Sequence, residues 1–103
     1  MKIEILFFND CPSWKIVLHD LREVLGKLEI NTDISLVKVE TRNEAMKYKF
    51  IGSPTIRINN IDVFPTKHND YGLGCRVYQT PQGLKGLPTK EMIRTQVEKI
   101  LLH

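Results

Sequence analysis

The stretch Asn9-Asp10-Cys11-Pro12-Ser13-Trp14 lies where an apolar run ends and a helical pattern begins. Proline lacks an N–H and its φ angle already suits a helix, so Pro12 is predicted at the first helical position and Cys11 at the N-cap. The free amides and positive dipole at that helix end favour the thiolate of Cys11, the form that does redox and metal chemistry. Because the adjacent Asp10 carboxylate opposes a second negative charge, we expect a modestly lowered pKa for the Cys11 thiol.

The residues around this stretch predict a strand, a helix and a second strand. A short apolar run over residues 3–8 indicates a buried strand. From Pro12 onward, apolar side chains recur at three- and four-residue steps, which predicts a helix that ends before Asn31. Apolar and polar residues alternate over 33–40, and the strand–helix–strand order predicts a parallel pair with a right-handed crossover.

The next elements are predicted from a cap and a turn. Thr41 and Glu44 have the spacing of a capping box, which predicts a short helix through about Tyr48. Residues 53–58 predict a third strand, and Asn59-Asn60, which tolerates positive φ, predicts a hairpin turn after it. The last two predicted elements are an antiparallel strand over 61–64 and an amphipathic helix over 89–102.

Residues 65–87 are the least regular part of the sequence. Six glycine and proline residues punctuate this segment, and its one strand-like island is Cys75-Arg76-Val77-Tyr78. A loop of this length is uncommon in a compact domain, so we expect the segment to be functional or to have a fold of its own.

The composition limits the class of protein. The 103 residues suffice for one domain, and 42% hydrophobic and 26% charged residues are ordinary for a soluble globular protein. A net charge of +3, without a basic tract or interleaved aromatic and basic residues, argues against nucleic-acid binding. The first eight residues lack signal-peptide features and no run reaches membrane-spanning length, so the two cysteines favour a reducing cytoplasm and no membrane partner.

Three motifs, in order along the chain, resemble the thioredoxin superfamily. They are Cys11-Pro12-Ser13-Trp14, Gly52-Ser53-Pro54-Thr55 and Gly72-Leu73-Gly74-Cys75-Arg76-Val77-Tyr78. The resemblance is closest to small bacterial and archaeal thioredoxin-like proteins, and it covers most of the chain except residues 65–87. It implies a single α/β domain of order β-α-β-α-β-β-α, with a central mixed four-stranded sheet and helices on both faces.

The resemblance also implies roles for individual residues. Ser53-Pro54 corresponds to the cis-proline bond of the superfamily, whose preceding residue offers its backbone to a bound thiol or peptide. Cys11 corresponds to the exposed cysteine that attacks disulfides. Trp14 is expected first as a packing residue of the core or its rim, and second as a wall of the thiol pocket. Pro12 is placed beside it in the candidate substrate site.

The chain departs from the Cys-x-x-Cys pattern of the disulfide reductases, because Trp14 stands where the second cysteine is expected. Cys75 is the only other cysteine, and the sequence leaves open whether it comes close enough to Cys11 to pair. With Leu73 and Val77 on either side, Cys75 is expected to be buried as a packing residue, whereas the helix position favours reactivity for Cys11.

These residues predict a thiol redox protein. Cys11 attacks a disulfide or is oxidised, and Cys75 or an external thiol resolves the product. The expected partners are protein or small-molecule thiols and disulfides, with no cofactor and no resident metal. The competing interpretation is a binding module whose Cys11–Pro54 face holds a peptide or a soft metal ion without turnover. A mixed metal site with His68 and Asp70 is disfavoured, since the spacing matches no zinc pattern.

Overall fold

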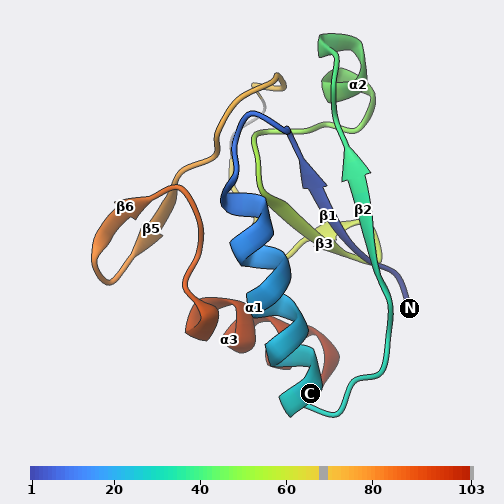
Figure 1. Ribbon diagram of the computed structural model, residues 1–103, viewed down its shortest axis with the longest axis vertical. Coiled ribbons are helices and arrows are strands. Elements are labelled where there is room, and N and C mark those ends of the chain that lie inside the picture. The colour runs from blue at the N-terminus through green and yellow to red at the C-terminus, as the bar shows by residue number, and fades with distance from the viewer. Residues whose placement is uncertain (68–69, 103) are drawn as a thin grey trace.

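The computed structural model, which describes residues 1–67 and 70–102, is built on a mixed four-stranded sheet (Figure 1). The strand order is β2-β1-β3-β4, in which β1 is parallel to β2 and antiparallel to β3, and β3 is antiparallel to β4. The parallel pair confirms the predicted strand–helix–strand unit. The four strands are β1 (Ile3–Phe7), β2 (Ile34–Lys38), β3 (Thr55–Ile58) and β4 (Ile61–Asp62).

The turn between β3 and β4 is formed by Asn59-Asn60, as predicted. Both residues have positive φ, of 52° and 69°, a conformation that asparagine tolerates better than most residues. β4 ends at Asp62, two residues before the predicted end. The N–H of Val63 still donates to the carbonyl of Ile56 in β3 at 3.0 Å, and the chain then turns where the Asp62 carboxylate accepts a hydrogen bond from the N–H of Phe64 at 2.9 Å.

The long helix α1 (Ser13–Lys27) follows β1 and begins one residue later than predicted. Pro12 occupies the N-cap position, Cys11 precedes it, and no side chain caps the helix. The shift arises because the N–H of Cys11 turns back to the carbonyl oxygen of Phe8, at 3.0 Å, and so belongs to the turn after β1. The buried side chains of α1 are Val17, Leu21, Val24 and Leu25.

Two further helices, α2 (Arg42–Lys47) and α3 (Lys90–Leu101), begin at threonine N-caps. Thr41 accepts from the N–H of Glu44, whose carboxylate accepts in turn from the N–H of Thr41, so the predicted capping box is confirmed. Thr89 caps α3, which matches the predicted final helix. Among the described residues, no helix is both long enough and apolar enough to cross a membrane.

Two clusters of buried apolar residues hold these elements together. The larger cluster joins β1 and β3 to α1 and α3, and these two helices pack against each other (Figure 1). In the smaller cluster, Leu6 of β1 packs with Val39, Ala45 and Phe50, and it anchors α2 at the end of the sheet (Figure 1). The buried members of the larger cluster are Ile3, Ile5, Val17, Leu21, Val24, Leu25, Ile56, Ile58, Val63, Ile93 and Val97.

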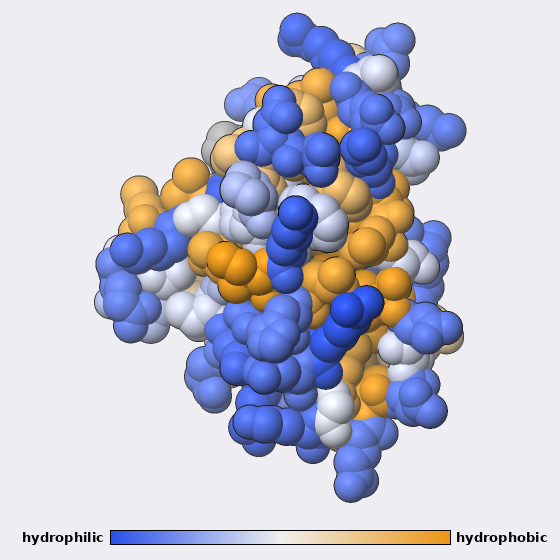
Figure 2. All heavy atoms as spheres, viewed as in Figure 1, coloured by the Kyte–Doolittle hydropathy of each residue, from blue (hydrophilic) through white to orange (hydrophobic). Residues whose placement is uncertain are grey.

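The described part of segment 65–87 contains a second, smaller sheet. Strands β5 (Tyr78–Thr80) and β6 (Gly83–Lys85) form an antiparallel hairpin that projects from the body of the protein (Figure 1). The predicted island at 75–78 overlaps this hairpin only at Tyr78. Figure 2 shows hydrophobic and hydrophilic residues side by side over the hairpin, in which Leu84 is exposed.

Candidate functional site

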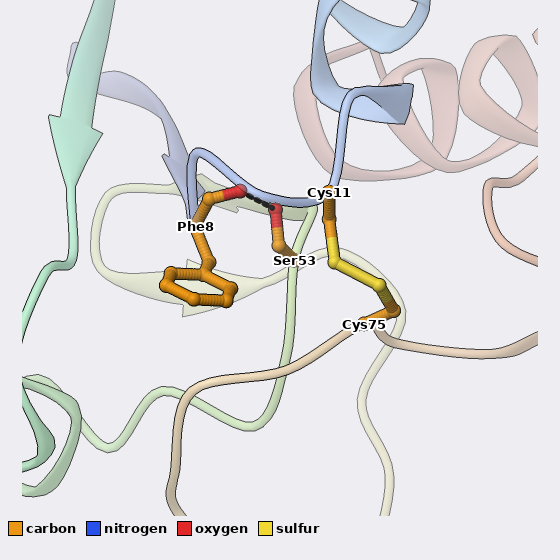
Figure 3. The surroundings of a disulfide bond; sticks show 4 residues. All are labelled: Phe8, Cys11, Ser53 and Cys75. Carbon is orange, nitrogen blue, oxygen red and sulfur yellow. Dashed lines mark hydrogen bonds between the residues drawn. A yellow bond between two sulfur atoms is a disulfide. The ribbon is translucent and has the colours of Figure 1, made fainter.

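A disulfide bond joins Cys11 to Cys75, which are 64 positions apart in the chain (Figure 3). Their Cα atoms lie 5.9 Å apart, within the range of ordinary disulfides. The structure therefore brings together the two thiols whose proximity the sequence left open. Both lie at the end of the sheet where β1 gives way to α1.

Cys11 is the buried partner, with only 2% of its surface exposed. It lies in the turn after β1, two residues before the first residue of α1. The resemblance implied an exposed attacking cysteine at this position, and that expectation is wrong for this disulfide form. In this form the sulfur of Cys11 is bonded to the sulfur of Cys75.

Cys75 is the exposed partner, contrary to the expectation that it is buried as a packing residue. The backbone from residue 76 to 80 alternates, with Arg76, Tyr78 and Thr80 buried and the residues between them exposed. Cys75 shares the outward side with its two apolar neighbours, Leu73 and Val77, which are themselves exposed. The prediction that Cys75 is buried, made from its apolar neighbours, is therefore wrong because this face of the segment turns to solvent.

The Cys75 segment is paired with the backbone beside Pro54. Ser53 and Cys75 form an isolated parallel bridge, in which the N–H of Ser53 donates to the carbonyl of Gly74 at 2.8 Å and its carbonyl accepts from the N–H of Arg76 at 2.9 Å. The Ser53–Pro54 peptide bond is cis, the isomer that the resemblance implies. The hydroxyl of the fully buried Ser53 also donates to the carbonyl of Phe8 at 3.5 Å, which connects this loop to the turn that carries Cys11 (Figure 3).

Gly52 makes the close approach of the two segments possible. Its φ angle is 135°, a value that residues with a side chain rarely adopt. A Cβ atom at this position would lie 2.9 Å from the Cβ and 3.0 Å from the Cα of Arg76. Only glycine therefore lets the backbone before Pro54 lie directly against the Cys75 segment.

Arg76 ties the segment to the β3–β4 hairpin from the inside. Its side chain is 6% exposed, and its guanidinium forms an ion pair with Asp62 at 2.8 Å. It also donates to the hydroxyl of Thr55 at 3.3 Å and to the carbonyl oxygen of Phe64. Such a buried cation is stable in place because it has both a counter-charge and hydrogen-bond acceptors.

Tyr78 continues the same buried face. Its hydroxyl donates to the carbonyl oxygen of Pro54, and the guanidinium of Arg76 lies 4.6 Å from its ring centroid. Burial raises the pKa of the Tyr78 hydroxyl, and the Asp62 carboxylate acts in the same direction while the Arg76 cation opposes it. Tyr78 therefore remains a neutral hydrogen-bond donor to the cis-proline loop over the ordinary pH range.

A cavity of about 360 Å³ opens beside the exposed cysteine. Its described lining residues are Ile51, Thr66, Asp70, Cys75, Arg76 and Val77. Cys11 is not among the described residues that line it. Access from this cavity therefore leads to the Cys75 half of the disulfide.

None of the four residues of the predicted substrate site is among the described residues that line this cavity, and two of them, Ser53 and Pro54, are buried. Trp14 is half-buried and stacks on Phe7, with ring centroids 4.1 Å apart, against the larger hydrophobic cluster. This is the packing role that the sequence favoured for it. Pro12 is exposed at the start of α1. Neither residue lines the cavity beside Cys75 within the described ranges.

The geometry of the described residues does not support either of the two metal sites considered from the sequence. In the disulfide form, the two cysteine sulfurs are bonded to each other, and His68 lies outside the described residues. Among the described residues, the one group of potential ligands is His19, Asp20 and Glu23 of α1. Glu23 is already in an ion pair with Lys90 of α3, so this group is accounted for as a charged surface contact.

Arg76, Tyr78 and Asp62 position the Cys75 segment, although no role was predicted for them. A signal was present, because an arginine and a tyrosine two residues apart in a strand-like island share one face. The motifs that carried the resemblance contain both residues. Comparison of this chain with protein families, with curated protein sequences and with solved structures finds no match.

Proposed function

We propose that this protein is a thioredoxin-like thiol redox protein whose redox couple is Cys11 and Cys75. The observation that carries the proposal is the disulfide between them, at the start of α1 and beside the cis Ser53–Pro54 bond. In the reducing cytoplasm that we propose as its location, disulfides are usually transient and catalytic. The proposed partners are small-molecule or protein thiols and disulfides.

The arrangement of the elements supports the thioredoxin-like assignment. The first six elements and the last helix follow the order β-α-β-α-β-β-α, and β1 is central between a parallel and an antiparallel neighbour. The hairpin of β5 and β6 is an addition between β4 and α3. The second cluster, in which Ala45 of α2 packs with Leu6, supports a placement of α2 against the face of the sheet opposite to α1 and α3.

The contacts of the Cys75 segment favour a redox couple over a structural staple. The backbone bridge to Ser53, the ion pair of Arg76 and the hydroxyl of Tyr78 hold the segment without help from the disulfide. A reduced protein can therefore keep both thiols in place for reoxidation. If the disulfide were the sole restraint on this loop, reduction would allow Cys75 to move away from Cys11.

The chemistry that the couple supports is two-electron thiol–disulfide exchange. An external thiolate attacks one sulfur, the Cys11–Cys75 bond breaks, and the other cysteine leaves as a thiolate with the bonding electron pair. A second external thiol then attacks the external sulfur of the mixed disulfide and releases the second cysteine. The protein disulfide is reduced to two thiols, and the two external thiols become one disulfide.

The experiment is a turnover assay with intact-mass readout. The protein is cycled with a low-molecular-weight thiol and a small disulfide, and the free thiols are counted at each stage. We expect reversible loss of two hydrogens in a monomer and catalysed exchange that Cys75→Ser abolishes. Tyr48→Phe is the control, because Tyr48 belongs neither to the disulfide nor to the described lining of the cavity beside it. If both thiols form but sustain no catalysed exchange, the redox proposal is contradicted and the binding module is favoured. A soft metal ion retained by the reduced protein would then identify the module as a metal-binding one.

A further inference from the structure

The two sulfurs of the disulfide are not equivalent in access. Cys11 is 2% exposed, whereas Cys75 is an exposed residue between the exposed side chains of Leu73 and Val77. The cavity of about 360 Å³ is lined by Cys75 and not, among the described residues, by Cys11. An attacking thiolate must approach in line with the S–S bond, so its target is the sulfur that faces solvent.

The two cysteine sulfurs also differ in their surroundings as leaving groups. Cys11 immediately precedes Pro12, the N-cap of the 15-residue helix α1, whose dipole favours a nearby negative charge, whereas burial and the adjacent Asp10 oppose a thiolate there. Cys75 lies outside any helix. The site of attack decides which cysteine leaves, because a thiolate that bonds to the exposed Cys75 sulfur must expel Cys11.

We infer that a small external thiol attacks Cys75 through this cavity and that Cys11 is the buried thiolate which this attack releases. The inference rests on the proposed redox function and assigns the two cysteines their separate roles. In the reducing direction, the new bond joins the external sulfur to Cys75, and the electron pair of the broken bond goes to Cys11. A second molecule of the same thiol then attacks the external sulfur, which leaves as a disulfide, and Cys75 departs as a thiolate.

The backbone around Ser53 favours a small thiol over an extended polypeptide. Both the N–H and the carbonyl of Ser53 already bond to Gly74 and Arg76 of the chain itself. An extended peptide therefore finds this backbone occupied when it approaches the cis-proline loop. What remains open is the cavity, which has a volume suited to a compact thiol and which is lined, besides Cys75, by Ile51, Val77, Thr66 and the charged residues Asp70 and Arg76.

The first arm of the test maps the mixed disulfide. Oxidised protein is mixed with limiting glutathione, quenched with acid at short times and alkylated, and its peptides are analysed by mass spectrometry. We expect glutathione on Cys75 and the alkyl group on Cys11. Glutathione on Cys11 would overturn the assignment of roles and leave the redox function intact. A disulfide that resists glutathione altogether would overturn both the inference and the redox function.

The second arm tests the route of attack with charge at the surface. Val77 lines the cavity and is 60% exposed, so Val77→Glu and Val77→Lys are compatible with folding. Ile16 is a matched control, because it is 53% exposed on α1, five positions after Cys11. At low ionic strength we expect Val77→Glu to slow reduction by anionic glutathione by at least about threefold and Val77→Lys to accelerate it, with little effect on neutral 2-mercaptoethanol.

Substitutions of Ile16 are expected to change these rates much less. If Ile16→Glu slows glutathione more than Val77→Glu does, attack comes from the α1 side and the inference is wrong. Because neither residue is a cysteine and both side chains are exposed, this comparison keeps the redox couple itself intact.

Discussion

The guanidinium of Arg76 forms a buried ion pair with the carboxylate of Asp62 at 2.8 Å, and this pair connects the segment that carries the exposed cysteine to the β3–β4 hairpin. The side chains are 6% and 20% exposed, so the pair is largely removed from water. It holds the residue next to Cys75 in place independently of the disulfide. The position of the proposed redox couple therefore depends on a contact that contains no sulfur.

Loss of this ion pair should destabilise the protein strongly. Arg76→Met leaves the Asp62 carboxylate without its cation and removes the bonds to Thr55 and Phe64, so we predict a loss of about 3 kcal/mol in the free energy of unfolding. Arg94→Met is the matched control, because its pair with Glu98 is exposed on α3 and should contribute at most about 0.5 kcal/mol. Urea denaturation of the oxidised proteins measures both, and equal losses would contradict the buried role of Arg76.

Gly52 should not tolerate a side chain. Gly52→Ala places a Cβ atom 2.9 Å from that of Arg76 and forces a φ of 135°, so we predict destabilisation of about 2 kcal/mol or more. Gly26→Ala is the opposite case, because nothing lies within 4 Å of its added Cβ and the position is helical. We expect it to stabilise the protein by roughly 0.5–1 kcal/mol. Thermal unfolding compares the two, and a neutral Gly52→Ala would refute the close approach.

The stability should fall at high pH because of Tyr78. Its folded-state pKa is raised above the ordinary value of 10 by burial, so the unfolded chain loses this proton first. The stabilising contribution is complete below pH 10 and is lost as the pH rises towards the folded pKa, by at most about 1.4 kcal/mol per pH unit.

Denaturation midpoints measured between pH 8 and pH 11 check this prediction, with the pH range chosen to bracket the ordinary pKa of 10. Tyr78→Phe should be less stable at pH 8, because it lacks the bond to Pro54, but its stability should decline less steeply above pH 10. Tyr48→Phe controls for the loss of a tyrosine hydroxyl elsewhere. A decline as steep in Tyr78→Phe as in the unchanged protein would assign the effect to other groups.

Reduction of the disulfide should weaken the protein without unfolding it. Closure of a loop of 64 positions contributes up to about 4 kcal/mol in the chain-entropy view. The contacts of Ser53, Arg76 and Tyr78 remain, so the reduced protein should still unfold cooperatively. Urea denaturation followed by the fluorescence of Trp14, the single tryptophan, measures the difference. A reduced protein without a cooperative transition would show that the disulfide is a structural staple.

Much of the sheet and its helices could be predicted because their signals are local. The capping box at Thr41, the Asn59-Asn60 turn and the apolar periodicity after Pro12 each specify a structure from residues a few positions apart. The start of α1 was displaced by one residue because the N–H of Cys11 bonds back to Phe8. Such a bond depends on the turn geometry and not on residue type.

The candidate site was less predictable because its contacts are distant in sequence. Nothing near Cys75 indicates that its backbone pairs with Ser53, 22 positions earlier, or that Arg76 reaches Asp62. The flanking Leu73 and Val77 suggested burial, yet the pairing with Ser53 turns that side of the segment outward and Arg76 inward. Hydrophobicity alone predicts the wrong buried face for a segment in which a polar residue such as Arg76 points inward.

The reduction potential of the Cys11–Cys75 couple tests the redox account most directly. The protein is equilibrated in a series of glutathione buffers, quenched with acid, and its oxidised fraction is measured by mass. We predict a two-electron transition in the range of thiol–disulfide oxidoreductases, roughly −120 to −270 mV. A potential below roughly −300 mV, the range of structural disulfides, would contradict the account and leave Cys11–Cys75 as a permanent bond.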